Sequence, residues 1–182
     1  AFMENPMLNF NIINAVFEVA ESENISEKHI KGLYIYTDSE SMVELLVKKQ
    51  GYRKLNFNYF CEADLAARDL FETFPLYKKL DFDRQTGLPQ GKKTIKILIL
   101  GFGFTGKHIL RRAIYNGLFD GCEFEAIVVD RCMNDIQGQF KNNYPALFSE
   151  CRPQNLKINF IQDTVRSDSF YELLKEYLIT DS

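Results

Sequence analysis

The segment 101–106, which reads GFGFTG, has the spacing most suggestive of chemistry. It follows an almost uninterrupted apolar run over 95–100 and opens a stretch with helical apolar spacing. In this context Gly101 permits a tight turn out of the strand, Gly103 lets a pyrophosphate approach the backbone, and Gly106 lets the helix pack closely on the strand. The N–H groups at the start of the helix would face the phosphates. The cofactor-binding residues expected here are Gly101, Gly103, Phe104, Thr105 and Gly106.

An acidic residue ends the next expected strand. Residues 124–130 read FEAIVVD, so that Asp130 follows Gly106 by 24 residues. A carboxylate at this place accepts hydrogen bonds from ribose hydroxyls and repels a 2′-phosphate, which favours NAD(H) over NADP(H). The adjacent Arg131 has two interpretations, a cation stacked on adenine or a surface charge.

A further pair of candidate residues, Asp163 and Thr164, follows the strand expected at 157–161. The carboxyl ends of parallel strands border one crevice, so this pair is a candidate for contact with adenine or ribose. A capping turn before the last helix explains the same residues. That helix is expected to begin through Ser167 or Ser169, and Ser169 and Glu172 have the spacing of a capping box.

Other chemistries lack support in the sequence. The four cysteines contain no CxxC pair and the two histidines stand apart from them, so we expect reduced thiols and no metal site. Tyr171 and Lys175 match the Tyr-x-x-x-Lys pair of short-chain dehydrogenases, but the glycine spacing does not fit that family. Lys107 and His108 are expected on a solvated helix face.

Strands and helices alternate along the chain. Helices are expected at 7–20, 40–50, 62–73, 106–116 and 168–178, and strands at 32–37, 54–60, 95–100, 124–130 and 157–161. Residues 133–149 are expected to form a mixed segment, because Gly138 and Pro145 interrupt it. The alternation predicts an α/β fold: a Rossmann-like parallel sheet with helices on both faces.

Residues 81–93 contain Gly, Pro and charge without periodicity and are predicted to form a linker. The linker separates an α/β segment, 1–80, from a dinucleotide-binding unit, 94–182. Residues 1–80 fit either the edge of the same sheet or part of a preceding domain. The chain stops after a helix where a further strand is expected, so we expect an excised fragment of a longer protein.

The composition limits the classes of partner. A net charge of −3 gives no broad field for attracting phosphate polymers, so nucleic-acid binding is not expected. The sequence has neither a signal peptide nor an apolar run long enough to span a bilayer, which favours a cytoplasmic location.

The segment KILILGFGFTGKHIL, followed by FEAIVVD and KINFIQDT, resembles the TrkA-N or RCK nucleotide-binding domains. Gly101, Gly103, Gly106 and Asp130 match the family pattern, whereas Gln162-Asp163-Thr164 is a loose match to its Gly-Asp-Ala-Thr turn. The upstream segments GLYIYTDSESMVELLVKK and FNYFCEADLAARDLFETFP are also similar. The resemblance implies a Rossmann-type regulatory domain of a potassium channel or transporter, at the cytoplasmic face of a membrane complex.

Three functions are open at this point. The first is a non-catalytic regulatory module that binds NAD(H), or alternatively ATP or ADP, and acts on a second copy, a partner domain or a membrane protein. The second is the cofactor domain of an NAD-dependent oxidoreductase, and the third is an interaction scaffold. The sequence favours the first, because an oxidoreductase needs a positioned proton donor and no residue has the context for one.

Overall fold

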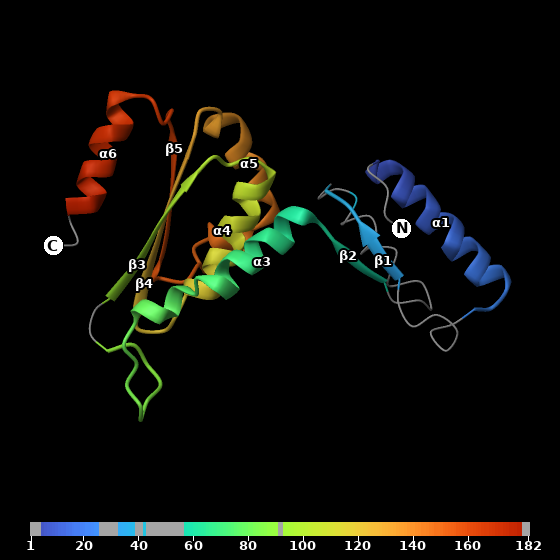
Figure 1. Ribbon diagram of the computed structural model, residues 1–182, viewed down its shortest axis with the longest axis horizontal. Coiled ribbons are helices and arrows are strands. Elements are labelled where there is room, and N and C mark those ends of the chain that lie inside the picture. The colour runs from blue at the N-terminus through green and yellow to red at the C-terminus, as the bar shows by residue number, and fades with distance from the viewer. Residues whose placement is uncertain (1–4, 26–32, 39–41, 43–56, 91–92, 180–182) are drawn as a thin grey trace. The chain divides into compact units, whose positions relative to one another are not determined.

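The computed structural model describes residues 5–25, 33–38, 42, 57–90 and 93–179. The chain divides into two compact units, 1–66 and 67–182, and the boundary falls inside helix α3 (Glu62–Thr73). Figure 1 follows the elements from α1 to α6 along the chain.

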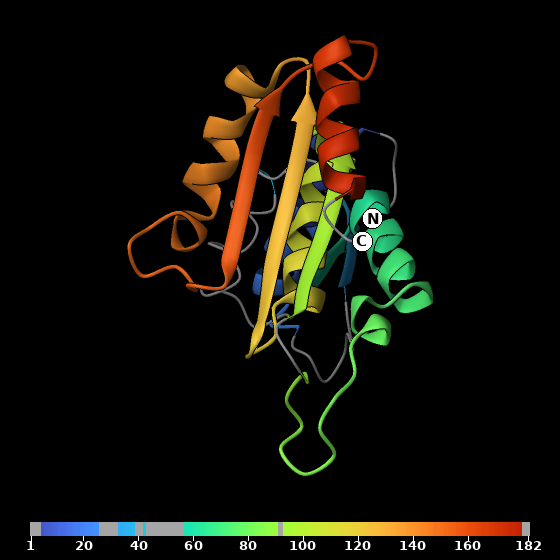
Figure 2. The same cartoon turned by 90° about the vertical axis from the view of Figure 1, so that its left-hand side faces the viewer.

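The second unit is built on a three-stranded parallel sheet. Its strands are β3 (Lys93–Leu100), β4 (Cys122–Asp130) and β5 (Leu156–Gln162), in the order β3-β4-β5. Leu100 pairs with Val129, and Asp130 pairs with Gln162. The carboxyl ends of all three strands therefore meet at one edge of the sheet, as Figure 2 shows.

Helices cover both faces of this sheet. Helices α4 (Phe104–Gly117) and α5 (Met133–Asn143) lie on one face and α6 (Asp168–Ile179) lies on the other (Figures 1 and 2). Alternate residues of β4 serve the two faces: Ala126 and Val128 belong to the α4–α5 core, whereas Ile127 and Val129 pack with Phe170 of α6. Burial of both faces explains the apolar run in β4. The predicted α/β, Rossmann-like fold is confirmed.

The first unit contains α1 (Pro6–Ser22) and a parallel pair of strands, β1 (Leu33–Tyr36) and β2 (Phe57–Phe60). The side chain of Asn5 caps α1 by accepting hydrogen bonds from the N–H groups of Met7 and Leu8. The buried Asn9 donates from its side chain to the carbonyl of Tyr36 at 3.0 Å, which ties the helix to β1.

The helix α5 is the main difference from the sequence expectation. The segment 133–149 was expected to be broken at Gly138, yet the helix runs from Met133 to Asn143. A single glycine costs a helix about 1 kcal/mol. Burial of Met133 and Phe140 against the sheet offsets that cost. A short 3-10 helix, Pro145–Leu147, follows.

Two further expectations concern the first unit and the linker. The helix expected at 40–50 lies outside the described residues apart from Met42. Residues 81–90, expected to be linker, lie inside the second unit, where Phe82 and Pro89 form an antiparallel bridge. The unit boundary falls earlier because Phe71 and Leu80 already belong to the core of the second unit.

Candidate functional site

The turn that leaves β3 has the backbone geometry expected of a glycine motif. Gly101 has a φ of +93°, a conformation that side-chain-bearing residues rarely adopt. The N–H group of Gly101 donates to the carbonyl of Val129 at 2.8 Å, which fixes the start of the turn on the neighbouring strand.

Helix α4 begins at Phe104, two residues before the predicted start. Gly103 is the N-cap, with φ −68° and ψ −163°, and its carbonyl accepts the N–H group of Lys107 at 3.1 Å. Within the described chain no side chain caps this helix. Phe104 and Thr105 therefore lie in the first turn, where N–H groups are directed out of the end of a helix.

Gly103 and Gly106 face different surroundings. A Cβ added to Gly103 would meet nothing within 4 Å, so the space in front of this residue is open to a ligand. A Cβ added to Gly106 would overlap the carbonyl oxygen of Gly101. Gly106 is therefore required by close packing of the helix on the turn, whereas no neighbour in the described part of the chain requires a glycine at position 103.

Asp130 holds the turn in place from the end of β4. Its Oδ2 accepts the N–H group of Phe102 at 2.7 Å, and its Oδ1 accepts the N–H group of Cys132 at 2.8 Å. The Phe102 ring is fully buried and contacts Phe140 and Phe160, each with ring centres 5.1 Å apart. A carboxylate has about four acceptor positions, so Asp130 keeps the capacity to accept from ribose hydroxyls.

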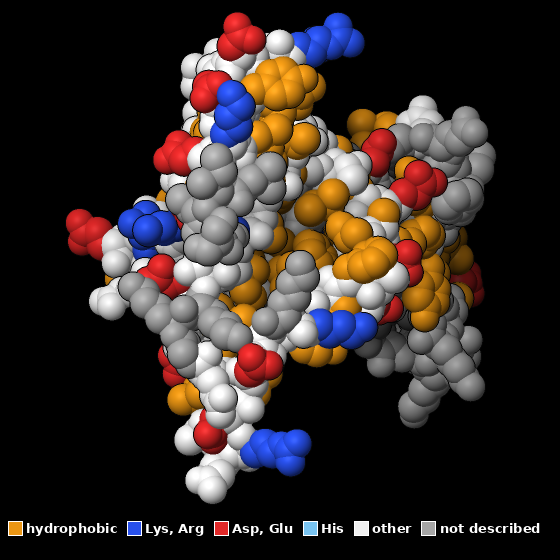
Figure 3. All heavy atoms as spheres, turned by 60° about the vertical axis from the view of Figure 1, so that its left-hand side comes forward, with side chains coloured by type: hydrophobic (Ala, Val, Ile, Leu, Met, Phe, Trp, Pro, Cys, Tyr) orange, Lys and Arg blue, Asp and Glu red, His pale blue; other side chains and the backbone are white. Residues whose placement is uncertain are grey.

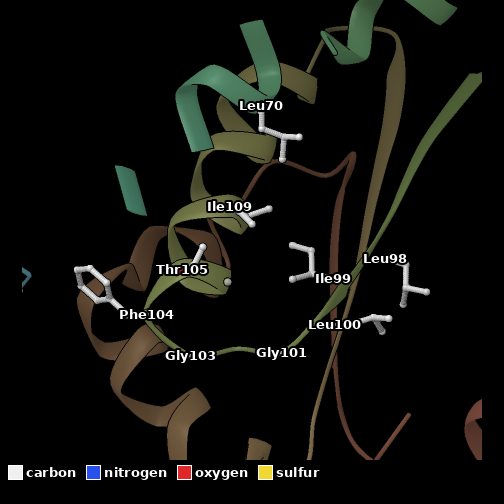
Figure 4. A pocket seen from close by; sticks show the side chains of 10 residues that line it. Leu70, Leu98, Ile99, Leu100, Gly101, Gly103, Phe104, Thr105 and Ile109 are labelled. Atoms are coloured by element: carbon white, nitrogen blue, oxygen red, sulfur yellow. The ribbon is translucent and has the colours of Figure 1, made fainter. Parts of the chain in front are cut away.

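A cleft of about 510 Å³ opens on the β3 side of the turn. In Figure 4 Ile99 points toward Ile109 of α4, whereas Leu98 and Leu100 lie on the other side of β3. On the face of the molecule drawn in Figure 3, many hydrophobic side chains (orange) are exposed at the surface. The cleft is lined by Leu70, Leu98, Ile99, Leu100, Gly101, Gly103, Phe104, Thr105, Gly106 and Ile109.

The remaining predicted site residues lie near the ends of β4 and β5. Arg131 and Thr164 are exposed. The N–H group of Asp163 donates to the carbonyl of Asp130 at 3.2 Å, so the two strand ends adjoin. The carboxylate of Asp163 is engaged in capping: it accepts the hydroxyls of Ser167 and Ser169, both at 2.6 Å, and the N–H group of Thr164 at 2.7 Å.

Of the two serines expected at the start of α6, Ser167 is the cap, and the expected capping box of Ser169 and Glu172 is not formed. Ser167 caps α6 by accepting the N–H group of Phe170 at 3.1 Å, and Glu172 instead pairs with Lys175 at 2.6 Å. The hydroxyls of Ser167 and Ser169, followed by the Thr164 amide, lower the pKa of Asp163 below its ordinary value. These hydrogen bonds support the interpretation of Asp163 as a capping residue. A contact of Asp163 with adenine stays a prediction.

The variant Asp163→Ala is expected to lower the stability of α6 at neutral pH. A carboxylate with a lowered folded-state pKa contributes stability above its ordinary pKa of 3.8, and this contribution is lost as the pH falls through the folded-state value. Urea denaturation of both proteins at neutral and strongly acidic pH checks this. The gap between wild type and variant should close in acid, and a gap of equal size at both pH values would contradict the assignment.

The structure corrects the expectation for His108. The side chain was expected to be solvated, but it is only 8% exposed. It packs edge-on against Phe104, with ring centres 4.8 Å apart, and its Nδ1 lies 3.3 Å from the guanidinium of Arg111. His108 therefore belongs to the buried face of α4 and not to a solvated one. Lys107 is half-buried and donates to the side chain of Gln139 at 3.0 Å.

The geometry does not support a disulfide, a metal site or a Tyr-x-x-x-Lys catalytic pair in the described part of the chain. None of the four cysteines forms a disulfide, and the described residues contain no cluster of three metal-ligating side chains. Lys175 is exposed on α6 and is ion-paired with Glu172, and Tyr171 is also exposed. Neither side chain lines the cleft beside the glycine turn.

Sequence reasoning missed two contributions to the site. Leu70, from α3, forms a wall of the cleft, and no local signal connects it to a motif about thirty residues later. Phe102, the second residue of the motif, was not predicted to contribute to the site. It lies between two glycines of the turn and its ring is fully buried, so it anchors the turn in the core.

No family model, curated protein or solved structure matches this chain. None of the described helices has the length and apolar character that crossing a bilayer requires.

Proposed function

We propose that this chain is a non-catalytic module that binds NAD(H), or a related adenine nucleotide such as ADP or ATP, and transmits its bound state to a partner. The pyrophosphate lies over Gly103 at the start of α4. The adenosine lies toward Asp130, and the second half of a dinucleotide lies in the cleft along β3.

The phosphate position is supported by the open space at Gly103 and by the first turn of α4. No side chain caps this helix within the described chain, so the N–H groups of Phe104 and Thr105 are available to an anion. The helix dipole adds favourable interaction with negative charge.

The adenosine position is supported by Asp130, which is half-buried at the carboxyl edge of the sheet. Its two hydrogen bonds to backbone N–H groups orient the carboxylate and leave acceptor capacity for ribose hydroxyls. The negative charge disfavours a ribose 2′-phosphate, which supports NAD(H) over NADP(H).

The proposal that the module is non-catalytic is supported by the residues that line the cleft. Among its lining residues there is no Asp, Glu, His, Lys, Arg, Tyr or Cys, and the hydroxyl of Thr105 is the single side-chain polar group. Hydride-transfer enzymes commonly position a proton donor beside the reacting carbon. The described part of this cleft can hold a ligand but offers no acid or base to a substrate.

A role in potassium transport, at the cytoplasmic face of a membrane protein, is the form of regulation that the likeness to TrkA-N domains favours. This part of the proposal rests on the glycine turn, Asp130 and the flanking sequence alone. A sensor of this kind needs a ligand whose affinity differs between two states of the partner, and it needs no reaction.

Thermal denaturation with NAD⁺, NADH, NADPH, ADP and ATP tests the proposal. A ligand at 100 times its dissociation constant stabilises the folded state by about 2.7 kcal/mol. We expect stabilisation by NAD⁺ or NADH and a weaker effect of NADPH. If none of the nucleotides shifts the transition, nucleotide binding is excluded. Stabilisation together with turnover of small alcohols or acids would indicate the oxidoreductase instead.

A further inference from the structure

The cleft beside the glycine turn is continuous with the proposed phosphate position. The residues that form the turn and the start of α4 also line the cleft: Gly101, Gly103, Phe104, Thr105 and Gly106. From there the lining continues between α4 and β3 as far as Leu70 of α3, which lies at the end of the cleft away from Gly103 in Figure 4. A dinucleotide held by its phosphates at Gly103 would extend its second half along this path.

Beyond the turn the walls of this cleft are apolar. Ile99 of β3 and Ile109 of α4 point toward each other in Figure 4. Leu98 and Leu100 line the β3 side, and Leu70 lines the far end. These three leucines are 37%, 52% and 38% exposed, so their apolar surface is available to a ligand. The second half of a dinucleotide would therefore meet hydrocarbon along most of its length.

The groups that could stabilise a cation are directed elsewhere in the described part of the chain. The ring of Phe104 points away from the cleft in Figure 4 and packs on His108. The carboxylates of Asp69 and Glu72, on α3, are exposed and do not line the cleft. Asp130 accepts two backbone N–H groups at the end of β4. The start of α4 adds the positive end of a helix dipole, which disfavours a cation further.

We propose that this cleft selects the reduced nicotinamide ring, so that the module binds NADH more tightly than NAD⁺, a selectivity that rests on the proposed nucleotide site. The oxidised ring carries a positive charge and the reduced ring is neutral. Transfer of a charge from water to an apolar wall without a partner is costly, whereas burial of a neutral ring there is favourable. The rest of the two molecules is identical, so the difference in affinity arises at the ring.

This selectivity gives the proposed module a defined signal. Because NADH and NAD⁺ compete for one site, the fraction of chains holding the reduced form follows the ratio of the two nucleotides. A partner that distinguishes the NADH-bound form from the others would then respond to the redox state of the nucleotide pool. The protein itself transfers no hydride in this scheme.

Equilibrium binding of NADH, NAD⁺ and ADP to the full chain tests this inference. The fluorescence of the reduced ring reports NADH binding directly, and NAD⁺ and ADP are measured by displacement. We expect NADH to bind at least about tenfold more tightly than NAD⁺, the ratio that corresponds to one poorly paired buried polar group. ADP should also bind more weakly than NADH, because it lacks the group that occupies the cleft.

The matched variants Leu70→Glu and Leu70→Gln test the position of the ring. The two side chains have nearly the same size, and only glutamate brings a negative charge to the far end of the cleft. Leu70→Glu should reduce or reverse the preference for NADH, whereas Leu70→Gln should keep it. The ratio of the two affinities within one variant cancels any change common to both nucleotides. Circular dichroism checks the fold, which should persist because Leu70 is 38% exposed on a helix.

The outcomes separate this inference from the proposed function. Equal affinity for NADH and NAD⁺, or tighter binding of NAD⁺, would overturn the selectivity and leave the nucleotide site in place. ADP binding as tight as that of NADH would do the same, since the second half of the dinucleotide would contribute nothing. A folded Leu70→Glu protein with the wild-type ratio would also overturn it. Failure of all three nucleotides to bind would instead refute the proposed function, and the selectivity with it.

Discussion

Gly103→Asp is expected to abolish nucleotide binding and to leave the protein folded. The residue is the N-cap of α4, where aspartate is among the favoured residues and stabilises a helix over glycine by roughly a few tenths of a kcal/mol. Apart from its two chain neighbours, no described atom lies within 4 Å of a Cβ at this position, so the backbone has room for a side chain. It would occupy the space proposed for the pyrophosphate and place a negative charge there. Stability should be unchanged or slightly raised while binding is lost.

The control for this variant is Gly138→Asp on α5. Gly138 is exposed, and a Cβ added there would also meet nothing within 4 Å. The substitution adds the same charge as Gly103→Asp, but on α5 and outside the glycine turn. Differential scanning fluorimetry with NADH measures both properties in one experiment. The Gly138 variant should retain the ligand-induced shift. If the Gly103 variant retained the full ligand-induced shift, the proposed phosphate position at the start of α4 would be wrong.

Gly106→Ala is expected to have the larger effect on stability. Alanine would gain up to about 1 kcal/mol from helix propensity. Its Cβ, however, would overlap the carbonyl oxygen of Gly101, which is backbone and cannot move aside without disturbing the turn. We expect a net loss of about 3 kcal/mol in the free energy of unfolding, in the range of overpacked cores.

Urea denaturation measures this effect, and Gly138→Ala provides the comparison. That exposed helical position has room for a methyl group, so alanine there should raise stability by up to about 1 kcal/mol. The two substitutions are chemically identical and are predicted to act in opposite directions. A Gly106→Ala protein as stable as wild type would mean that helix and turn are farther apart than described.

The structure gives Asp130 a second task. The carboxylate accepts the N–H group of Phe102 inside the glycine turn, so removing it would affect both the proposed ribose contact and the shape of the turn proposed to bind phosphate. Asp130→Ala should therefore weaken the binding of nucleotides, and it should weaken the binding of pyrophosphate alone to a smaller degree. Competition titrations with the two ligands separate these contributions.

Much of the fold could be predicted from local pattern. The helix 62–73 was predicted with the bounds it has, because helix formers fill it and Pro75 follows its end. The helix 133–143 was missed because the stabilising contacts of Met133 and Phe140 are with residues distant in sequence. A glycine lowers local helix propensity, but the pattern alone does not reveal how much burial offsets it.

The glycine turn was well predicted, and its neighbourhood was less so. Gly101 and Gly106 have the conformation and close contact that the motif requires, because these depend on adjacent elements. His108 is buried although we expected it to be solvated, and Leu70 reaches the cleft from a separate helix. Asp163 illustrates an ambiguity within one residue type: a strand-end carboxylate can face a ligand or cap a helix, and here its contacts are capping contacts.

Calorimetric titration of NADH into the wild-type chain and into Gly103→Asp is the most direct test of the central claim. The account predicts one saturable site per chain in the wild type, weaker binding of NADPH, and no measurable binding by the variant. Absence of binding to the wild type, or equal binding to both proteins, would contradict the assignment of the glycine turn as a nucleotide site.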